Sequence, residues 1–260
     1  MNTVARHIAA EGRRDQVRFY VYVWEFPVRL FHWLNALCIV VLGVTGYLIG
    51  HPVSFVSGSE ASLQYWFGSV RFVHFLTAYV WIAVAFLRIY WGFVGNEYVR
   101  FEQFLPLRKS QWRDIMTVIR CDVLQIWRGV SETIGHNPLA GLSYAIAFLA
   151  FAFQVFTGFA LFSDMSSAWF PDLFSWVIPF MGGDASVRLW HHMILWFFTV
   201  FLIVHVYLTA YHDYVEATGT ISSMIGGWKF VRKLPEKAKA LRPLAEAEEE
   251  IHELKEGTKS

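Results

Sequence analysis

The most constraining feature of the chain is an apolar run from Trp190 to Asp213, which reads WHHMILWFFTVFLIVHVYLTAYHD. About 20 residues at a 1.5 Å rise cross a bilayer, so the run is long enough to span one. It nevertheless carries His191 and His205 in its interior. A polar ring in hydrocarbon is costly and usually has a partner. Two imidazoles fourteen residues apart share one helix face, about 21 Å apart along the axis, which predicts two separate sites at two membrane depths.

Three further apolar runs, at about 31–50, 71–94 and 139–162, predict an all-α membrane protein with four spans. Hydrophobic residues make up 55% of the 260 positions and charged residues only 17%, a balance that soluble domains of this size rarely have. We therefore expect an N-terminal arm (1–30), a four-helix transmembrane bundle (31–213, last span 190–213) and a C-terminal tail (214–260). Apolar residues at helical spacing in 109–129 predict an amphipathic helix in the loop between the second and third spans.

Lysine and arginine are distributed unevenly among the connections, which indicates the orientation of the spans. The arm, the 95–138 loop and the segment after the fourth span are rich in them, whereas the other two connections carry only Arg71 and Arg188. Both termini are therefore expected in the cytoplasm. Histidines then pair by depth: His74 with His191 on the outer side, and His32 with His205 on the inner side.

Neutral imidazoles from opposite helices are the ligands of bis-histidine haem iron. Four histidines matched by depth predict two stacked b haems, although any single transmembrane histidine can instead be an interhelical hydrogen-bonding contact. His192 lies about 140° from the shared face and is expected to be a neighbour of the site or a surface residue rather than a ligand. The remaining boundary histidines are expected to be interfacial: His51, His136 and His212.

An arginine precedes three of the four histidines by three residues, which is about one helical turn. Arg29, Arg71 and Arg188 could thus pair with the propionates of the same haem, because guanidinium binds carboxylate in a bidentate fashion. The alternative is interfacial snorkelling, which accounts well for Arg29 but less well for the other two, since they lie on the side poor in cations. Arg88 is a further candidate at the inner haem.

Several stretches resemble one family: YVWEFPVRLFHWLNA, RFVHFLTAYVW, GHNPLA, and WHH with thirteen residues to HVY. The chain is similar, over about residues 20–233, to the b-type cytochrome subunit of membrane-bound uptake [NiFe] hydrogenases, a diheme four-helix cytochrome b family. GHNPLA together with the histidine spacing is specific. The histidine pattern alone is shared with formate dehydrogenase gamma subunits and related diheme cytochromes.

The resemblance implies a bacterial inner-membrane subunit that anchors a periplasmic hydrogenase. The partner would be the small subunit, with its iron–sulfur clusters and C-terminal membrane helix, and through it the large subunit that splits hydrogen. Electrons would pass from the clusters to the outer haem (His74, His191), then the inner haem (His32, His205), then membrane quinone. Quinone is expected near the cytoplasmic face, where His136 and Asn137 are candidates, although Asn137 before Pro138 also fits an ordinary helix start.

The chain has two cysteines, Cys38 and Cys121, and neither a nickel-binding cysteine motif nor a cysteine set for iron–sulfur clusters. We therefore expect an electron-transfer subunit that performs no hydrogenase chemistry itself, with lipid and quinone but no nucleic acid among its partners. Two alternatives remain open from the sequence. One is the equivalent subunit of a formate dehydrogenase or thiosulfate reductase, and the other is a haem-free membrane anchor or a transporter.

Overall fold

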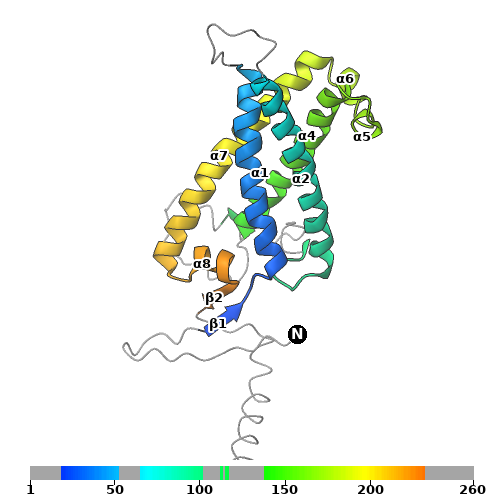
Figure 1. Ribbon diagram of the computed structural model, residues 1–260. Helices are drawn as coiled ribbons and strands as arrows, with labels where there is room; N and C mark the ends of the chain where they lie inside the picture. Colours follow the sequence, from blue (N-terminus) through cyan, green and yellow to red (C-terminus); the bar gives the residue numbers. More distant parts are fainter. Residues whose placement is uncertain (1–18, 53–64, 102–111, 114, 117–137, 232–260) are drawn as a thin grey trace, which may run out of the picture.

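The computed structural model describes residues 19–52, 65–101, 112–113, 115–116 and 138–231. Four long helices dominate it: α1 (Phe26–Gly50), α2 (Trp66–Val94), α4 (Pro138–Ser163) and α7 (Asp184–Glu216) (Figure 1). Each is long and apolar enough to cross a membrane. The four-helix fold predicted from the sequence is thus confirmed. All four helices start before the expected spans, since polar and aromatic first turns continue the helices beyond the apolar runs.

The helices are arranged as two antiparallel hairpins that meet through α1 and α7. α1 packs on α2, α4 packs on α7, and α1 also contacts α7. The turn between α4 and α7 is built from two short helices, α5 (Trp169–Asp172) and α6 (Val177–Phe180). These lie at the same end as the last turn of α1 and the first turn of α2, here called the loop end, as Figure 1 shows.

A small antiparallel sheet closes the opposite end of the bundle, here called the sheet end. β1 (Phe19–Tyr22) pairs with β2 (Trp228–Val231), which follows the short helix α8 (Thr220–Gly226). The sequence reasoning missed this sheet, although FYVYVW alternates in the manner of a strand with one buried face. The sheet joins the segments before α1 and after α7, so both leave the bundle at the same end (Figure 1).

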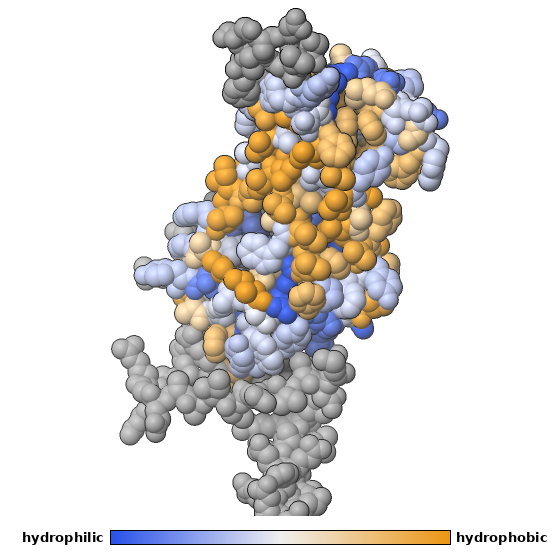
Figure 2. Space-filling model, viewed as in Figure 1, coloured by the Kyte–Doolittle hydropathy of each residue, from blue (hydrophilic) through white to orange (hydrophobic). Residues whose placement is uncertain are grey.

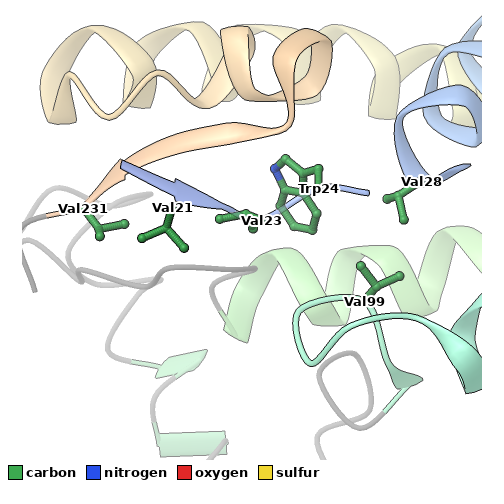
Figure 3. Packing of buried hydrophobic residues seen from close by; sticks show 6 residues of the cluster. All are labelled: Val21, Val23, Trp24, Val28, Val99 and Val231. Carbon is green, nitrogen blue, oxygen red and sulfur yellow. The ribbon is translucent and has the colours of Figure 1, made fainter. Parts of the chain in front are cut away.

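An apolar cluster under the sheet anchors the start of α1. It contains Val21, Val23, Trp24, Val28, Val99 and Val231, and Val23 and Val99 are 0% and 1% exposed (Figure 3). The Trp24 ring turns toward α8, where its Nε1 donates to Ser223 Oγ at 3.2 Å. Arg29 of α1 also donates to Ile225 O of α8. These contacts hold the first turns of α1, and therefore His32, at a defined depth.

The outer surface of the bundle is apolar, as expected for a multi-pass membrane protein. Apolar side chains gather over the middle of the face shown in Figure 2. Large hydrophobic residues on α1, α2 and α7 are strongly exposed, among them Val44 (57%), Phe86 (66%) and Ile203 (64%). Such a contiguous surface would be unfavourable in water and is suited to lipid.

The expected loop helix at 109–129 falls mostly outside the described residues. Trp112, Arg113, Ile115 and Met116 are helical, and Ile115 is 2% exposed. The helical conformation predicted here is thus seen at these four positions, while the amphipathic character of the whole segment stays a prediction.

Candidate functional site

An aromatic layer in the middle of the bundle divides its interior into two levels. Cys38 of α1, Trp81 of α2 and Phe198 of α7 are buried together, and apolar residues of α4 pack against them. Trp81 meets Phe198 edge-on, and its Nε1 donates to Asn35 Oδ1 at 2.7 Å. All four helices contribute to this layer, so it fixes their relative heights.

His32 and His205 lie together at the sheet end. Their ring centroids are 6.3 Å apart, with an interplanar angle of 48°. Phe201 stacks on the His205 ring at 5.6 Å, and Trp33 meets the His32 ring edge-on. Nδ1 of His32 is buried and has no hydrogen-bond partner among the described residues. The two imidazoles come from α1 and α7, as the depth argument predicted.

His74 and His191 lie on the other side of the aromatic layer, at the loop end. They are close enough to interact electrostatically. Nδ1 of His74 is 2.8 Å from Thr45 Oγ1, and Nδ1 of His191 is 2.8 Å from Thr157 Oγ1. Each ring is therefore held by a hydroxyl from the neighbouring helix of its own hairpin.

A glycine follows each of these threonines and makes room for the ring. A Cβ at Gly46 would lie 3.3 Å from Cε1 of His74, and one at Gly158 would lie 3.1 Å from Cε1 of His191. The sequence analysis did not identify the two threonines as partners of the histidines. The available signal was the repeated Thr-Gly pair in the first and third spans.

The neighbouring His192 points to a different helix. A Cβ at Gly50 of α1 would lie only 2.2 Å from Cε1 of His192, so this ring packs directly on the last turn of α1. It interacts electrostatically with His51, whose ring stacks on Tyr47 at 4.6 Å. His191 thus lies against α4 and His192 against α1, and both interact electrostatically with His74.

Two of the arginines expected near haem propionates are exposed at the loop end. Arg71 lies over the Phe67 ring at 5.0 Å. Arg188 pairs through Nε with Asp184 Oδ2 at 2.7 Å, and their side chains are 60% and 43% exposed. An exposed ion pair of this kind contributes little stability, so the Arg188 side chain can be redirected at small cost. Their propionate roles stay predictions.

The two arginines nearer the sheet end, Arg29 and Arg88, donate hydrogen bonds to backbone carbonyl oxygens of other segments. Arg29 donates to Ile225 O at the end of α8. Arg88 is 7% exposed; its Nη2 donates to Val99 O at 3.2 Å, and its guanidinium lies over the Tyr144 ring at 5.3 Å. Both side chains therefore connect α1 or α2 to the segments that close this end. His136 and Asn137, the candidates for quinone, lie outside the described residues.

The two histidine pairs can each supply a pair of axial ligands. Along α1, thirteen residues separate His32 from Thr45, which holds His74, so the two levels are about 20 Å apart. Imidazole is a haem ligand, the glycines remove side-chain bulk beside the two loop-end rings, and the His32 and His205 rings face each other with centroids 6.3 Å apart. The residues present thus fit haem iron at both levels.

Comparison with known proteins identifies the family. Residues 23–227 match the sequence profile of the family described as "Prokaryotic cytochrome b561". The chain belongs to this family. A relative from Azotobacter chroococcum mcd 1 is 43% identical over 217 residues, which cover 82% of this chain and 89% of the relative. A relative from Cupriavidus necator is 39% identical over 212 residues, covering 80% and 86%. Both are named "Probable Ni/Fe-hydrogenase B-type cytochrome subunit".

A third relative, from Escherichia coli K12, is 39% identical over 213 residues, which cover 80% of this chain and 90% of the relative. It is named "Probable Ni/Fe-hydrogenase 1 B-type cytochrome subunit". The family resemblance predicted from the sequence motifs is therefore confirmed. Membership in a b-type cytochrome family implies haem b in this four-helix membrane protein, while the number of haems and the identity of the ligands stay predictions.

Proposed function

We propose that this cytochrome b561 family member is the electron-transfer subunit of a hydrogen:quinone oxidoreductase. It would accept electrons from a [NiFe] hydrogenase and pass them through two bis-histidine haems to membrane quinone. The observation that carries the proposal is the presence of two histidine pairs, one toward each end of the bundle and on opposite sides of the aromatic layer. Two redox groups at two depths are what electron transfer across a membrane requires.

The chain's own residues would hold and orient the two haems. His74 of α2 and His191 of α7 would ligate one at the loop end, and His32 of α1 and His205 of α7 the other at the sheet end. Haem b, when bound, supplies reversible one-electron chemistry at its iron. The buried Trp81, Phe198 and Cys38 keep water out of the space between the levels, so each site lies in a low-dielectric environment.

The partner would dock at the loop end, on the periplasmic side of a bacterial inner membrane. The small subunit would bring its iron–sulfur clusters there, and its C-terminal membrane helix would pack against the exposed apolar helices. The sheet end and both termini would be cytoplasmic, and His136 and Asn137 would contact quinone on that side. On this proposal residues 31–213 form the diheme domain between the arm (1–30) and the tail (214–260). The names of the relatives favour hydrogenase over formate dehydrogenase or thiosulfate reductase as the partner.

Histidine variants test the proposal directly. His74→Ala and His191→Ala should each remove the loop-end haem, because one axial ligand is lost. Hydrogen-driven quinone reduction should then stop, while reduction of an artificial dye by the catalytic subunits continues. Visible spectra of the purified complex report the haem, and His51→Ala is the matched control, since that ring stacks on Tyr47 at the surface. Undiminished quinone reduction in either variant would refute the assignment of this pair.

A further inference from the structure

Thr45 and Thr157 form a matched pair of contacts around the loop-end histidines. Both hydroxyls are buried, since the residues are 9% and 0% exposed, and both lie 2.8 Å from a histidine Nδ1. The first belongs to the α1–α2 hairpin and the second to the α4–α7 hairpin. In each hairpin, a threonine followed by a glycine on one helix contacts a histidine on the other helix of that hairpin.

The hydroxyl hydrogens are already engaged, which sets the direction of the contacts to histidine. Thr45 Oγ1 lies 2.6 Å from Val41 O, and Thr157 Oγ1 lies 2.8 Å from Phe153 O, each one helical turn back. A hydroxyl has one hydrogen to donate and two lone pairs that accept. With the hydrogen directed to the carbonyl oxygen, the hydroxyl accepts from Nδ1–H of the histidine.

This direction selects one tautomer of each imidazole. A neutral ring that carries its hydrogen on Nδ1 has its lone pair on Nε2, the nitrogen that can bind iron. If the hydroxyl donated to Nδ1 instead, Nε2 would carry the hydrogen and could not act as a ligand. A partner on the second ring nitrogen also fixes the ring orientation and raises the basicity of the ligand.

We infer that Thr45 and Thr157 are positioning residues that hold His74 and His191 in the iron-binding tautomer and lower the reduction potential of the loop-end haem. A more basic ligand stabilises the ferric state over the ferrous state, which lowers the potential. The sheet-end pair differs, because Nδ1 of His32 has no hydrogen-bond partner within the described chain. A lower reduction potential at the loop-end haem than at the sheet-end haem favours electron flow from the former to the latter. The inference rests on the haem ligation proposed above.

Isosteric removal of the hydroxyls tests the inference. In Thr45→Val and Thr157→Val, the midpoint potential of one haem should become more positive while that of the other is unchanged. We expect a threefold to tenfold change in the oxidised-to-reduced ratio at a fixed potential, which corresponds to about 30 to 60 mV for one electron. Redox titration of the purified complex by visible spectroscopy measures both haems. Thr45→Ser and Thr157→Ser keep a hydroxyl and should restore the original potential.

Thr199→Val is the matched control. Thr199 lies on α7 and its hydroxyl donates to Leu195 O at 2.9 Å, the same contact one turn back, with no histidine bonded to it in the described structure. Its removal should leave both potentials unchanged. If Thr→Val chains lose the loop-end haem altogether, the serine variants must recover it, and failure to do so would overturn the positioning role.

Two outcomes separate this inference from the proposed function. Unchanged potentials in both valine variants, together with loss of the loop-end haem in His74→Ala and His191→Ala, would overturn the threonine role and leave the ligand assignment standing. Retention of the loop-end haem in the histidine variants would instead refute the ligand assignment, and the threonine role with it.

Discussion

Substituting alanine for Gly158 should disturb the loop-end haem without unfolding the bundle. The added Cβ would lie 3.1 Å from Cε1 of His191, closer than ordinary carbon contacts of 3.4 Å or more. The ring must therefore move away from α4 by at least 0.3 Å. Thr157, one residue earlier on the same helix, holds Nδ1 of this ring at 2.8 Å, so the movement stretches that hydrogen bond.

The loss of binding free energy for the haem can be estimated from the stretched hydrogen bond. A displacement of this size takes the bond toward the 3.2 Å limit for N–H···O contacts, and a typical hydrogen bond contributes about 0.5 to 1.5 kcal/mol. Loss of most of it would weaken retention of the loop-end haem by about twofold to tenfold, at about 1.4 kcal/mol per tenfold. Global stability should not fall, because alanine in a helix interior is more favourable than glycine by about 0.5 to 1 kcal/mol.

Transfer of haem to an excess of apomyoglobin, followed by visible absorbance, measures retention, and thermal unfolding in detergent measures stability. Gly43→Ala is the control, since its Cβ would meet the flexible end of Leu195 at 3.4 Å. Faster haem loss in Gly158→Ala, with Gly43→Ala like the wild type, is the expected result. Equal rates of haem loss in Gly158→Ala, Gly43→Ala and the wild type would refute the claim that Gly158 makes room for the His191 ring.

Two further predictions concern stability. Asn35→Leu should cost about 1 to 3 kcal/mol in the free energy of unfolding, because it leaves the buried Trp81 Nε1 without its acceptor. Thermal unfolding of Asn35→Leu, Trp81→Phe and the double variant checks this, and strictly additive effects would contradict the hydrogen bond. Burial and then Glu97 raise the pKa of Tyr98 above its ordinary 10.0. The unfolded chain therefore loses this proton first as pH rises above 10, and stability falls. Tyr98→Phe should lack this loss of stability above pH 10. If the free energy of unfolding fell equally with pH in both proteins, Tyr98 would not be its cause.

The four-helix fold could be predicted because each span is an almost unbroken apolar run, and hydrocarbon allows few alternatives to a helix. The sheet at the sheet end was missed for the opposite reason. β1 and β2 are only four residues each and lie more than 200 positions apart, so their pairing depends on the fold that brings them together. The strand pattern FYVYVW is short and adjoins an arginine-rich arm, and its partner strand adjoins a polar tail, so neither segment was predicted as a strand.

The candidate site was predictable in part. His32 and His205 were paired by depth, and the structure brings their rings together at 6.3 Å. The threonines were not found, because a threonine within a span ordinarily bonds its own helix and gives no sign of a second contact. The partners of the arginines were equally hidden. Arg29 donates to Ile225 O, 196 positions further along the chain, and spacing in the sequence cannot reveal such a contact.

The central claim is that four histidines from three helices hold two haems at two levels. Counting haem b per chain in the purified complex, by the pyridine haemochrome spectrum against total protein, tests it most directly. The account predicts two haems per chain in the wild type and one in each of His74→Ala, His191→Ala, His32→Ala and His205→Ala. A wild-type value of one or none, or an unchanged count in these variants, would contradict it.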